Sequence, residues 1–172
     1  MKFYFLSDIA AKQKLYSQHQ AQASFIRVLF SDGTLANLLF RAQAFFSELK
    51  IFPLALFFHL LNKYINGCVI GLGARFESGF VLIHPIGVVI NSSVRGGNNV
   101  WLESAVVIGD NNGRSPVLGN NIFVGSGAKI IGGLSIGDRV RIGANAVVLI
   151  NLPDDCTAVG VPARILPTKE SP

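Results

Sequence analysis

Residues 118–148 read LGNNIFVGSGAKIIGGLSIGDRVRIGANAVV, and an aliphatic residue returns at every sixth position. The same step of six runs between residues 70 and 106, and all thirteen positions of the two runs are apolar. They are Ile70, Phe76, Leu82, Val88, Val94, Val100, Val106, Leu118, Val124, Ile130, Ile136, Ile142 and Val148. A helix repeats about every 3.6 residues and a plain strand every two, so neither explains this period. It predicts a parallel β-solenoid of stacked three-sided coils, with aliphatic side chains inside and glycines at the corners.

The repeat is interrupted at residues 109–116, which read GDNNGRSP. Asn112 occupies the place where the next aliphatic residue would fall, and the segment has the glycine, proline and short polar residues typical of loops. We interpret this as the single break in the phase. It predicts a loop that leaves the wall of the solenoid and covers a neighbouring site.

The chain changes character near residue 66. Ten of its thirteen phenylalanines precede residue 67, and seventeen of its eighteen glycines follow residue 66. Between Leu35 and Ile65 apolar residues recur at helical spacing, with Ser31-Asp32 as the expected N-cap, Pro53 in a first turn and Asn66-Gly67 as the stop. We therefore expect an α-helical segment over residues 1–66, a β-helix over 67–166 and a tail over 167–172.

Composition limits the possible partners. The 172 residues are 50% hydrophobic and 15% charged, which excludes general disorder. The net charge of +5 includes no run of basic residues, so nucleic acid is not expected as a partner. Two cysteines, Cys68 and Cys156, suit a reducing compartment, and residues 51–61 are too short to cross a bilayer. We expect a cytoplasmic protein whose apolar helices pack against protein, with membrane contact at most peripheral.

Several motifs resemble the hexapeptide-repeat acyltransferases, a family of left-handed parallel β-helices. These motifs are LIHPIGVVI at 82–90, the loop at 109–116, VGSGAKI at 124–130, IGANAVV at 142–148 and GVPARI at 160–165. The likeness covers residues 37–166 and is greatest to the serine O-acetyltransferase branch, in particular its relatives that acetylate bacterial polysaccharides. It implies acetyl-CoA as the acyl donor and a homotrimer with sites between adjacent subunits. No metal is expected, because a metal site needs several neighbouring histidines and the repeat region has only His84. The N-terminal helices are expected either to join two trimers or to pack on the β-helix.

The resemblance also assigns roles to residues. His84 corresponds to the catalytic histidine, and Arg114 to an arginine that binds the acceptor. The expected coenzyme-binding residues are Ser126, Gly127, Ala128, Lys129, Ala144 and Arg164. Histidine is a suitable base for acetyl transfer because its ordinary pKa is ~6.5, and such proton transfer contributes ~10²–10⁴-fold. Without the resemblance, the residues favour an ordinary histidine at a solenoid corner over a catalytic one.

The chain departs from serine acetyltransferases at three polar positions of the site. Ile83 replaces the aspartate before the histidine, Val69 replaces the aspartate that orients the imidazole, and Ser115 replaces a histidine after the loop arginine. Serine needs fixed charges for both of its ends, so these departures favour a sugar hydroxyl as the acceptor. Serine is the alternative, and a non-catalytic scaffold is the third possibility. Glu103, eighteen residues after Pro85, could orient His84 from the next coil, as could a backbone carbonyl.

Overall fold

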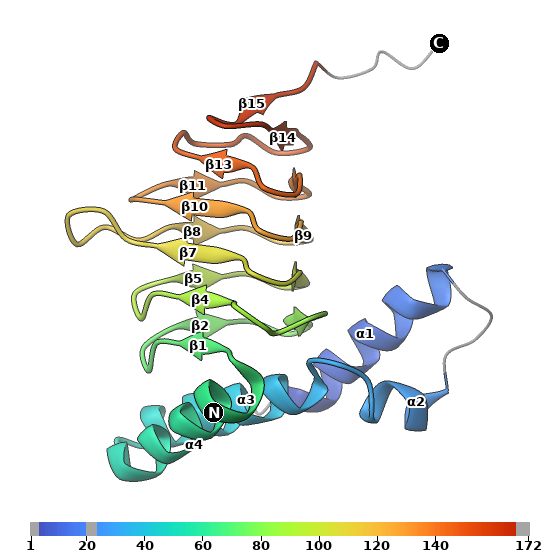
Figure 1. The fold of residues 1–172 in the computed structure, drawn as a ribbon, viewed down its shortest axis with the longest axis vertical. Helices are drawn as coiled ribbons and strands as arrows, with labels where there is room; N and C mark the ends of the chain where they lie inside the picture. Colours follow the sequence, from blue (N-terminus) through green and yellow to red (C-terminus); the bar gives the residue numbers. More distant parts are fainter. Residues whose placement is uncertain (1–3, 20–23, 168–172) are drawn as a thin grey trace.

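The computed structural model describes residues 4–19 and 24–167, which form a triangular prism with helices at one end (Figure 1). The helices are α1 (Phe5–His19), α2 (Phe25–Leu29), α3 (Thr34–Glu48) and α4 (Phe52–Asn66). The strands are β1 (Val69–Ile70), β2 (Arg75–Phe76), β3 (Val81–Leu82), β4 (Val89–Ile90), β5 (Arg95–Gly96), β6 (Val100–Leu102), β7 (Val107–Gly109), β8 (Val117–Leu118), β9 (Ile122–Val124), β10 (Lys129–Ile131), β11 (Ser135–Ile136), β12 (Arg141–Ile142), β13 (Val147–Val148), β14 (Thr157–Val159) and β15 (Arg164–Ile165). The predicted class, a parallel β-helix preceded by helices, is confirmed. Of the expected tail, residues 168–172 lie outside the described residues.

Each of the first four coils contributes one strand to each of three sheets, and the last coil adds strands to the first and third sheets only. The first sheet has the order β1-β4-β7-β10-β13, the second β11-β8-β5-β2, and the third β15-β14-β12-β9-β6-β3. Strands within a sheet are parallel except for β15, which runs antiparallel to β14 at the end of the stack. All thirteen positions of the six-residue repeat are at most 4% exposed, so the predicted core is confirmed.

The prediction of a single break in the phase is wrong. Val81 pairs with Trp101, which makes the first coil twenty residues long, whereas Lys129 pairs with Val147 at a spacing of eighteen. Eight residues separate the paired strand positions Leu82 and Ile90, where six were expected. The two additional residues fall at the corner that carries His84. The break at 109–116 lengthens its coil to twenty-two residues.

Helix α3 closes the lower end of the prism. Its Phe40 is fully buried in the same core cluster as the aliphatic column. Three polar side chains of α3 bond to the otherwise open strand edges, one for each sheet. Gln43 donates to Ile70 O of the first sheet, Arg41 to Phe76 O of the second, and Asn37 to Phe80 O beside the third. Bare strand edges are prone to pair with other chains, and α3 removes all three at once.

The helix boundaries differ from prediction at one place. Helix α4 has Pro53 in its first turn and ends at Gly67 in the left-handed region (φ 59°), as expected. The N-cap of α3 is Gly33 and not Ser31-Asp32, and it makes no side-chain cap bond. The Asp32 side chain is therefore available for another contact. None of the described helices is long and apolar enough to cross a membrane.

Candidate active site at one corner of the β-helix

The corner between the third and first sheets holds most of the predicted site residues. His84 follows β3, Glu103 follows β6, Ser126 follows β9 and Ala144 follows β12, so they occupy consecutive levels of one column. Backbone bonds tie these levels together: Ala105 N donates to Ile86 O at 2.9 Å, Gly127 N to Ser104 O at 2.8 Å and Asn145 N to Ser126 O at 2.8 Å. The β-helix therefore brings together residues that are up to sixty positions apart in the chain.

His84 projects from the longer corner between β3 and β4. Its side chain is 53% exposed, and its Nδ1 lies 3.3 Å from Oδ2 of Asp32. Asp32 belongs to the turn before α3, and Gly33 of that turn has a φ of 77°. A Cβ at Gly33 would overlap the carbonyl of Leu82, so glycine is needed for the turn to approach β3 this closely.

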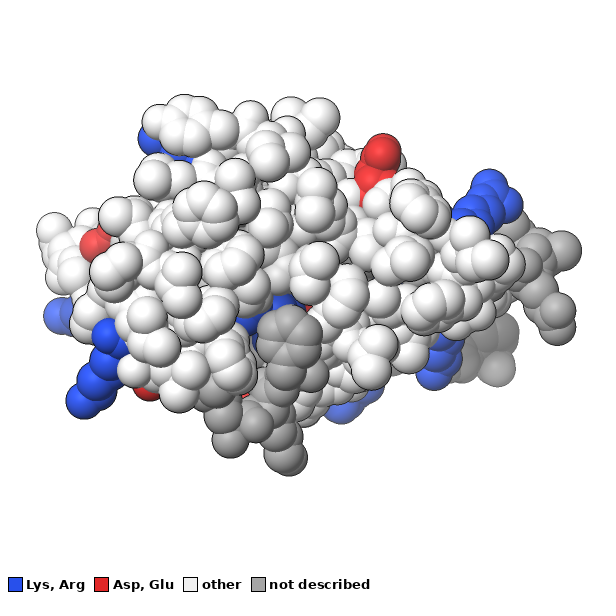
Figure 2. All heavy atoms as spheres, turned by 90° about the horizontal axis from the view of Figure 1, so that it is seen from below, with Lys and Arg blue, Asp and Glu red and all other residues white. Residues whose placement is uncertain are grey.

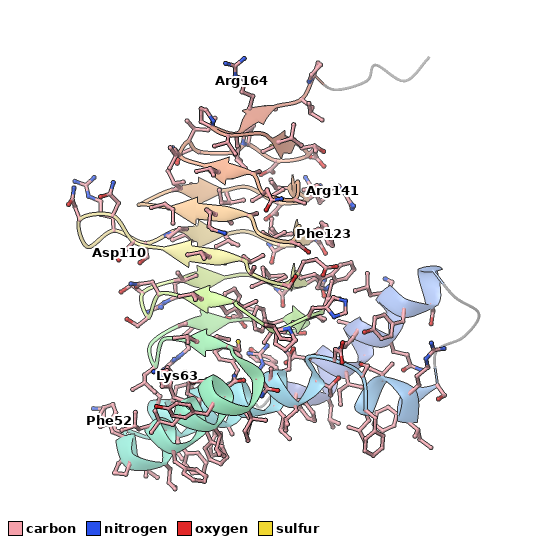
Figure 3. All side chains as sticks on the ribbon, viewed as in Figure 1. Phe52, Lys63, Asp110, Phe123, Arg141 and Arg164 are labelled. Carbon is pink, nitrogen blue, oxygen red and sulfur yellow. The ribbon has the colours of Figure 1, made fainter. Side chains whose placement is uncertain are left out.

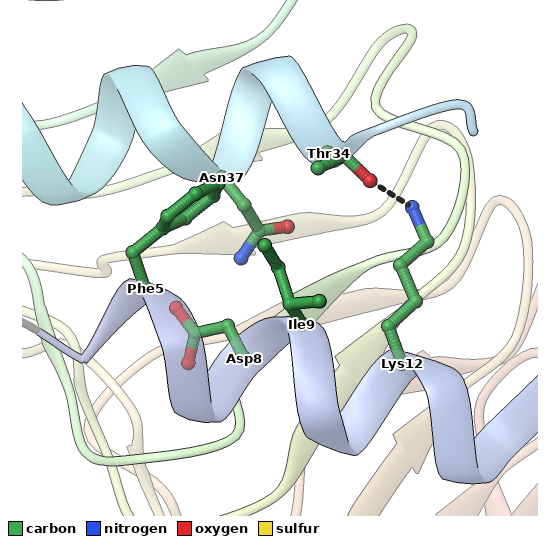
Figure 4. Close-up of a pocket in the computed structure, with 6 residues that line it drawn as sticks. All are labelled: Phe5, Asp8, Ile9, Lys12, Thr34 and Asn37. Atoms are coloured by element: carbon green, nitrogen blue, oxygen red, sulfur yellow. Dashed lines mark hydrogen bonds between the residues drawn. The ribbon is translucent and has the colours of Figure 1, made fainter. Parts of the chain in front are cut away.

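Lys12 of α1 holds the Asp32 turn in place. Its Nζ donates to Thr34 Oγ1 at 3.1 Å (Figure 4) and to the backbone carbonyl of Asp32. Lys12 is only 2% exposed, and burial lowers its pKa to about 8 although the nearby Asp32 carboxylate acts in the opposite direction. The roles of Lys12 and Asp32 at this site were not predicted from the sequence, because neither residue lies in the repeat and their partners are distant in the chain.

A cavity of about 290 Å³ opens beside the imidazole. The lining residues come from the α2–α3 connection, the start of α3, the end of α4 and the His84 corner. They are Phe30, Ser31, Asp32, Gly33, Leu35, Ile65, Asn66, His84, Pro85 and Ile86. The cavity thus combines one imidazole and one carboxylate with several apolar side chains, which is the kind of lining that binds small molecules.

One of the departures seen in the sequence, Ile83, has a structural explanation. Ile83 is 7% exposed and belongs to an apolar cluster with Leu15 of α1, so it anchors that helix. Glu103 does not stack on Pro85, which was the basis for its predicted role: Ile83 N donates to Leu102 O, so Glu103 lies one coil beyond Ile83. The carboxylate beside the imidazole is instead that of Asp32.

The expected coenzyme-binding residues differ in accessibility. Ser126 and Gly127 are half-buried on the column, and Ala144 is exposed. Ala128 is fully buried, and its N–H donates to Gly125 O within the coil. Lys129 Nζ donates to Gly127 O at 2.6 Å and to Ala105 O at 3.2 Å, which keeps its ammonium against this corner.

Further cations lie toward the upper end of the prism (Figure 3). Arg141 lies over the ring of Phe123, with 5.0 Å between the guanidinium carbon and the ring centroid. Arg164 is exposed on β15, beside β14. Five strand spacings of ~4.8 Å separate β3 from β15 in the third sheet, so Arg164 lies about 24 Å from the His84 level along the axis.

Arg114 is not brought to His84 within one chain. The loop at 109–116 connects β7 of the first sheet to β8 of the second, which is a different corner of the prism. The loop is closed by a bridge between Asn111 and Arg114, and Gly113 N donates to Asp110 Oδ2 at 3.1 Å. Among the described residues, no group of three or more histidine, cysteine, aspartate or glutamate side chains is arranged to hold a metal ion.

Comparisons with known proteins agree with this architecture. The family model described as bacterial transferase hexapeptide (six repeats) matches residues 115–149. A serine acetyltransferase of Helicobacter pylori is 36% identical over 143 residues, which cover 81% of this chain and 84% of the relative. This chain belongs to the hexapeptide-repeat acyltransferases of the serine acetyltransferase family. The predicted family is confirmed, whereas the greater similarity to polysaccharide acetyltransferases stays a prediction.

Solved structures of the family share the fold. A serine acetyltransferase from Brucella abortus superposes with a TM-score of 0.86 at 30% identity, covering 95% of this chain and 67% of that one. A serine acetyltransferase in complex with CoA gives a TM-score of 0.86 at 28% identity, covering 94% of this chain and 68% of that one.

The serine acetyltransferase of Synechococcus elongatus is 40% identical over 110 residues, but these span 45% of that relative. Some family members are thus considerably longer than this chain.

Proposed function

We propose that this chain transfers the acetyl group of acetyl-CoA to a hydroxyl acceptor, with His84 as the general base. The supporting observation is the imidazole of His84 at the mouth of a cavity, held by Asp32 and placed on the column of small residues. With Nδ1–H donating to Asp32, Nε2 carries the lone pair that can accept a proton. Asp32 is a positioning residue in this scheme, replacing the carboxylates absent at Val69 and Ile83.

The reaction needs one proton to move twice. His84 Nε2 takes the proton of the acceptor hydroxyl while its oxygen attacks the thioester carbonyl carbon. The tetrahedral intermediate then collapses with cleavage of the C–S bond, and the imidazolium returns the proton to the departing thiolate. Backbone N–H groups of the glycine-rich corner are suited to stabilise the oxyanion.

The donor would extend along the column from His84 toward Arg164. The small residues Ser126, Gly127 and Ala144 leave room for the pantetheine arm, and exposed arginines near the upper end suit its phosphates. Glu103 remains a candidate for a polar contact on the same column.

The acceptor side requires a second copy of the chain. Arg114 and His84 project from different corners, so an arginine of this loop can reach an imidazole only across an interface between copies. We therefore propose a homotrimer with sites shared between adjacent subunits, consistent with the family resemblance. This predicts that mixing inactive His84→Ala and Arg114→Ala proteins under conditions of subunit exchange restores part of the activity.

L-Serine is the acceptor that the relatives favour, because they are named serine acetyltransferases. In this chain Asp32 could bind its ammonium group and Arg114 its carboxylate. A sugar hydroxyl is the second candidate, favoured by the apolar side chains of Phe30, Leu35 and Ile86 in the cavity and by the loss of polar residues at Val69 and Ser115. The site supports acetyl transfer under either assignment.

Release of the coenzyme A thiol from acetyl-CoA tests this function, with L-serine and a panel of sugars and nucleotide sugars as acceptors. We expect His84→Ala to lower kcat by ~10²–10⁴-fold. The matched control is His59→Ala, because His59 of α4 has its Nδ1 3.0 Å from Ile70 O of β1 and does not line the cavity. An active His84→Ala enzyme would overturn the proposed base, and binding of coenzyme without transfer to any acceptor would support a scaffold instead.

The role of Asp32 is tested separately with Asp32→Asn and Asp32→Glu. Asp32 and His84 are 76% and 53% exposed, so solvent screens their interaction and its loss costs at most about 1 kcal/mol, or roughly fivefold in kcat. A positioning role predicts a similar kcat loss for every acceptor and rescue by glutamate. Direct binding of serine would instead raise KM for serine while leaving KM for sugars unchanged.

A further inference from the structure

Helix α4 presents large apolar side chains that the other described residues leave partly exposed. Of the fifteen residues of α4, only Ala55 and Asn62 are fully buried. Six large apolar side chains of α4 are between 38% and 60% exposed: Phe52, Leu54, Leu56, Phe57, Leu60 and Ile65. We call these six residues the end face. An apolar surface of this kind on a helix marks an interaction site.

The end face lies at the flat lower end of the prism. Figure 1 shows α3 and α4 running across this end, and Figure 2 shows it from below as a broad, mostly uncharged surface with Lys and Arg side chains, and also some Asp and Glu side chains, around its margin. Residues 49–66 contain no aspartate or glutamate, whereas Lys50 and Lys63 (the latter labelled in Figure 3) are exposed there. The nearest preceding acid, Glu48, pairs with Arg75 at 3.3 Å.

We infer that the end face docks on the surface of a membrane containing anionic lipid. Helices that lie in the membrane interface combine leucine and phenylalanine on one side with lysine or arginine at the polar margin. A second trimer joined through this end, which the family resemblance led us to expect, is the less suitable occupant, because residues 49–66 of the other copy contain no carboxylate to pair with Lys50 and Lys63. An anionic lipid surface supplies the missing negative charge.

The end face is continuous with the cavity beside His84. Ile65 belongs to both, and Phe30 and Leu35, which line the cavity, are 85% and 47% exposed. Docking through α4 would therefore bring the cavity mouth close to the lipid surface. A hydroxyl carried on a lipid headgroup could then reach the imidazole, although the docking itself does not depend on which acceptor is used.

Sedimentation with sucrose-loaded vesicles tests the docking with the full chain. We expect binding to vesicles of phosphatidylcholine and phosphatidylglycerol, weaker binding to phosphatidylcholine alone, and weakening by salt. Phe52→Ser/Phe57→Ser removes two exposed anchors and is expected to reduce binding roughly ten- to hundredfold. The matched control is Val117→Ser/Leu149→Ser, which changes two equally exposed apolar residues of the β-helix.

Two further readouts keep the outcome decisive. The fluorescence of Trp101, the single tryptophan, reports whether each variant keeps its fold, and thiol release reports the acetyl transfer independently. Lys50→Glu/Lys63→Glu leaves the apolar anchors intact and is expected to abolish the preference for phosphatidylglycerol. The inference is overturned if the chain does not bind vesicles, or if Phe52→Ser/Phe57→Ser binds them as well as the unchanged chain does. It is also overturned if that variant forms a smaller assembly, because the end face would then hold a second copy.

Discussion

Replacing Asp8 by asparagine should destabilise the fold more than any comparable surface change. Asp8 of α1 is 2% exposed and Arg41 of α3 is 5% exposed. Arg41 Nε donates to Asp8 Oδ2 at 2.7 Å, Arg41 Nη2 to Oδ1 at 3.0 Å, and Gly79 N to Oδ1 at 2.9 Å. Burial raises the pKa of Asp8 while Arg41 opposes it, so the ionised carboxylate depends on its partner.

The size of the effect follows from the burial of both groups. Asp8→Asn keeps the volume but leaves the Arg41 cation without its counter-ion, and breaking a buried pair in this way costs about 3–5 kcal/mol. For a chain of this size, that loss corresponds to a fall in Tm of about 6–20 °C. The same contact ties α1 to α3, and α1 carries the Lys12 that holds the Asp32 turn.

Urea unfolding at one protein concentration, followed by Trp101 fluorescence, measures the difference. The control is Glu48→Gln, which removes a pair of similar chemistry whose side chains are 44% and 30% exposed, and it should cost less than about 1 kcal/mol. If the unfolding free energies of Asp8→Asn and Glu48→Gln differ by less than about 1 kcal/mol, which is the value typical of a surface pair, the buried pair does not secure α1.

Three other predictions concern single positions. The pKa of buried Lys12 is about 8, so above this pH the folded chain loses a proton that the unfolded chain keeps. The unfolding free energy should therefore rise by about 1–2 kcal/mol between about pH 7.5 and 9.5, relative to the Lys12→Met variant. An equal pH dependence of the two proteins would contradict this. Burial raises the pKa of Cys68 to about 12, so a thiol reagent at mildly alkaline pH should label it only after unfolding, as mass spectrometry would show. At Gly71 a Cβ would lie 2.5 Å from the backbone of Ser92, so Gly71→Ala should cost about 1–3 kcal/mol in the same urea assay, and an unchanged midpoint would mean that the coils can separate.

The six-residue period predicted the core because it is a local pattern repeated many times. It did not reveal the longer corner at His84, since stepping by six from Leu82 reaches Val88, which is also fully buried. Each side of a coil has two inward positions, and aliphatic residues fit both. The two additional residues at the His84 corner therefore change which of the two positions the step of six reaches, but they place no polar residue in the core.

The contact between Asp32 and His84 could not be predicted in the same way. The two residues are fifty-two positions apart, and their approach depends on how α3 docks on the first coil. Asp32 precedes a helix, where an aspartate is commonly a cap, and its sequence neighbourhood offers no sign of another role. Family resemblance likewise suggested carboxylates at the positions of Val69 and Ile83, and the structure supplies one from a different element.

The closure of the prism by α3 has a consequence for folding during synthesis. Helix α3 is synthesised before the strands whose edges it covers. The nascent β-helix therefore grows from a helix that is already present, and the lower edges of its first strands are covered from the start. A fragment starting after α3 would expose three unpaired backbone rims of β1, β2 and β3 at once, and such fragments should join end to end into fibres.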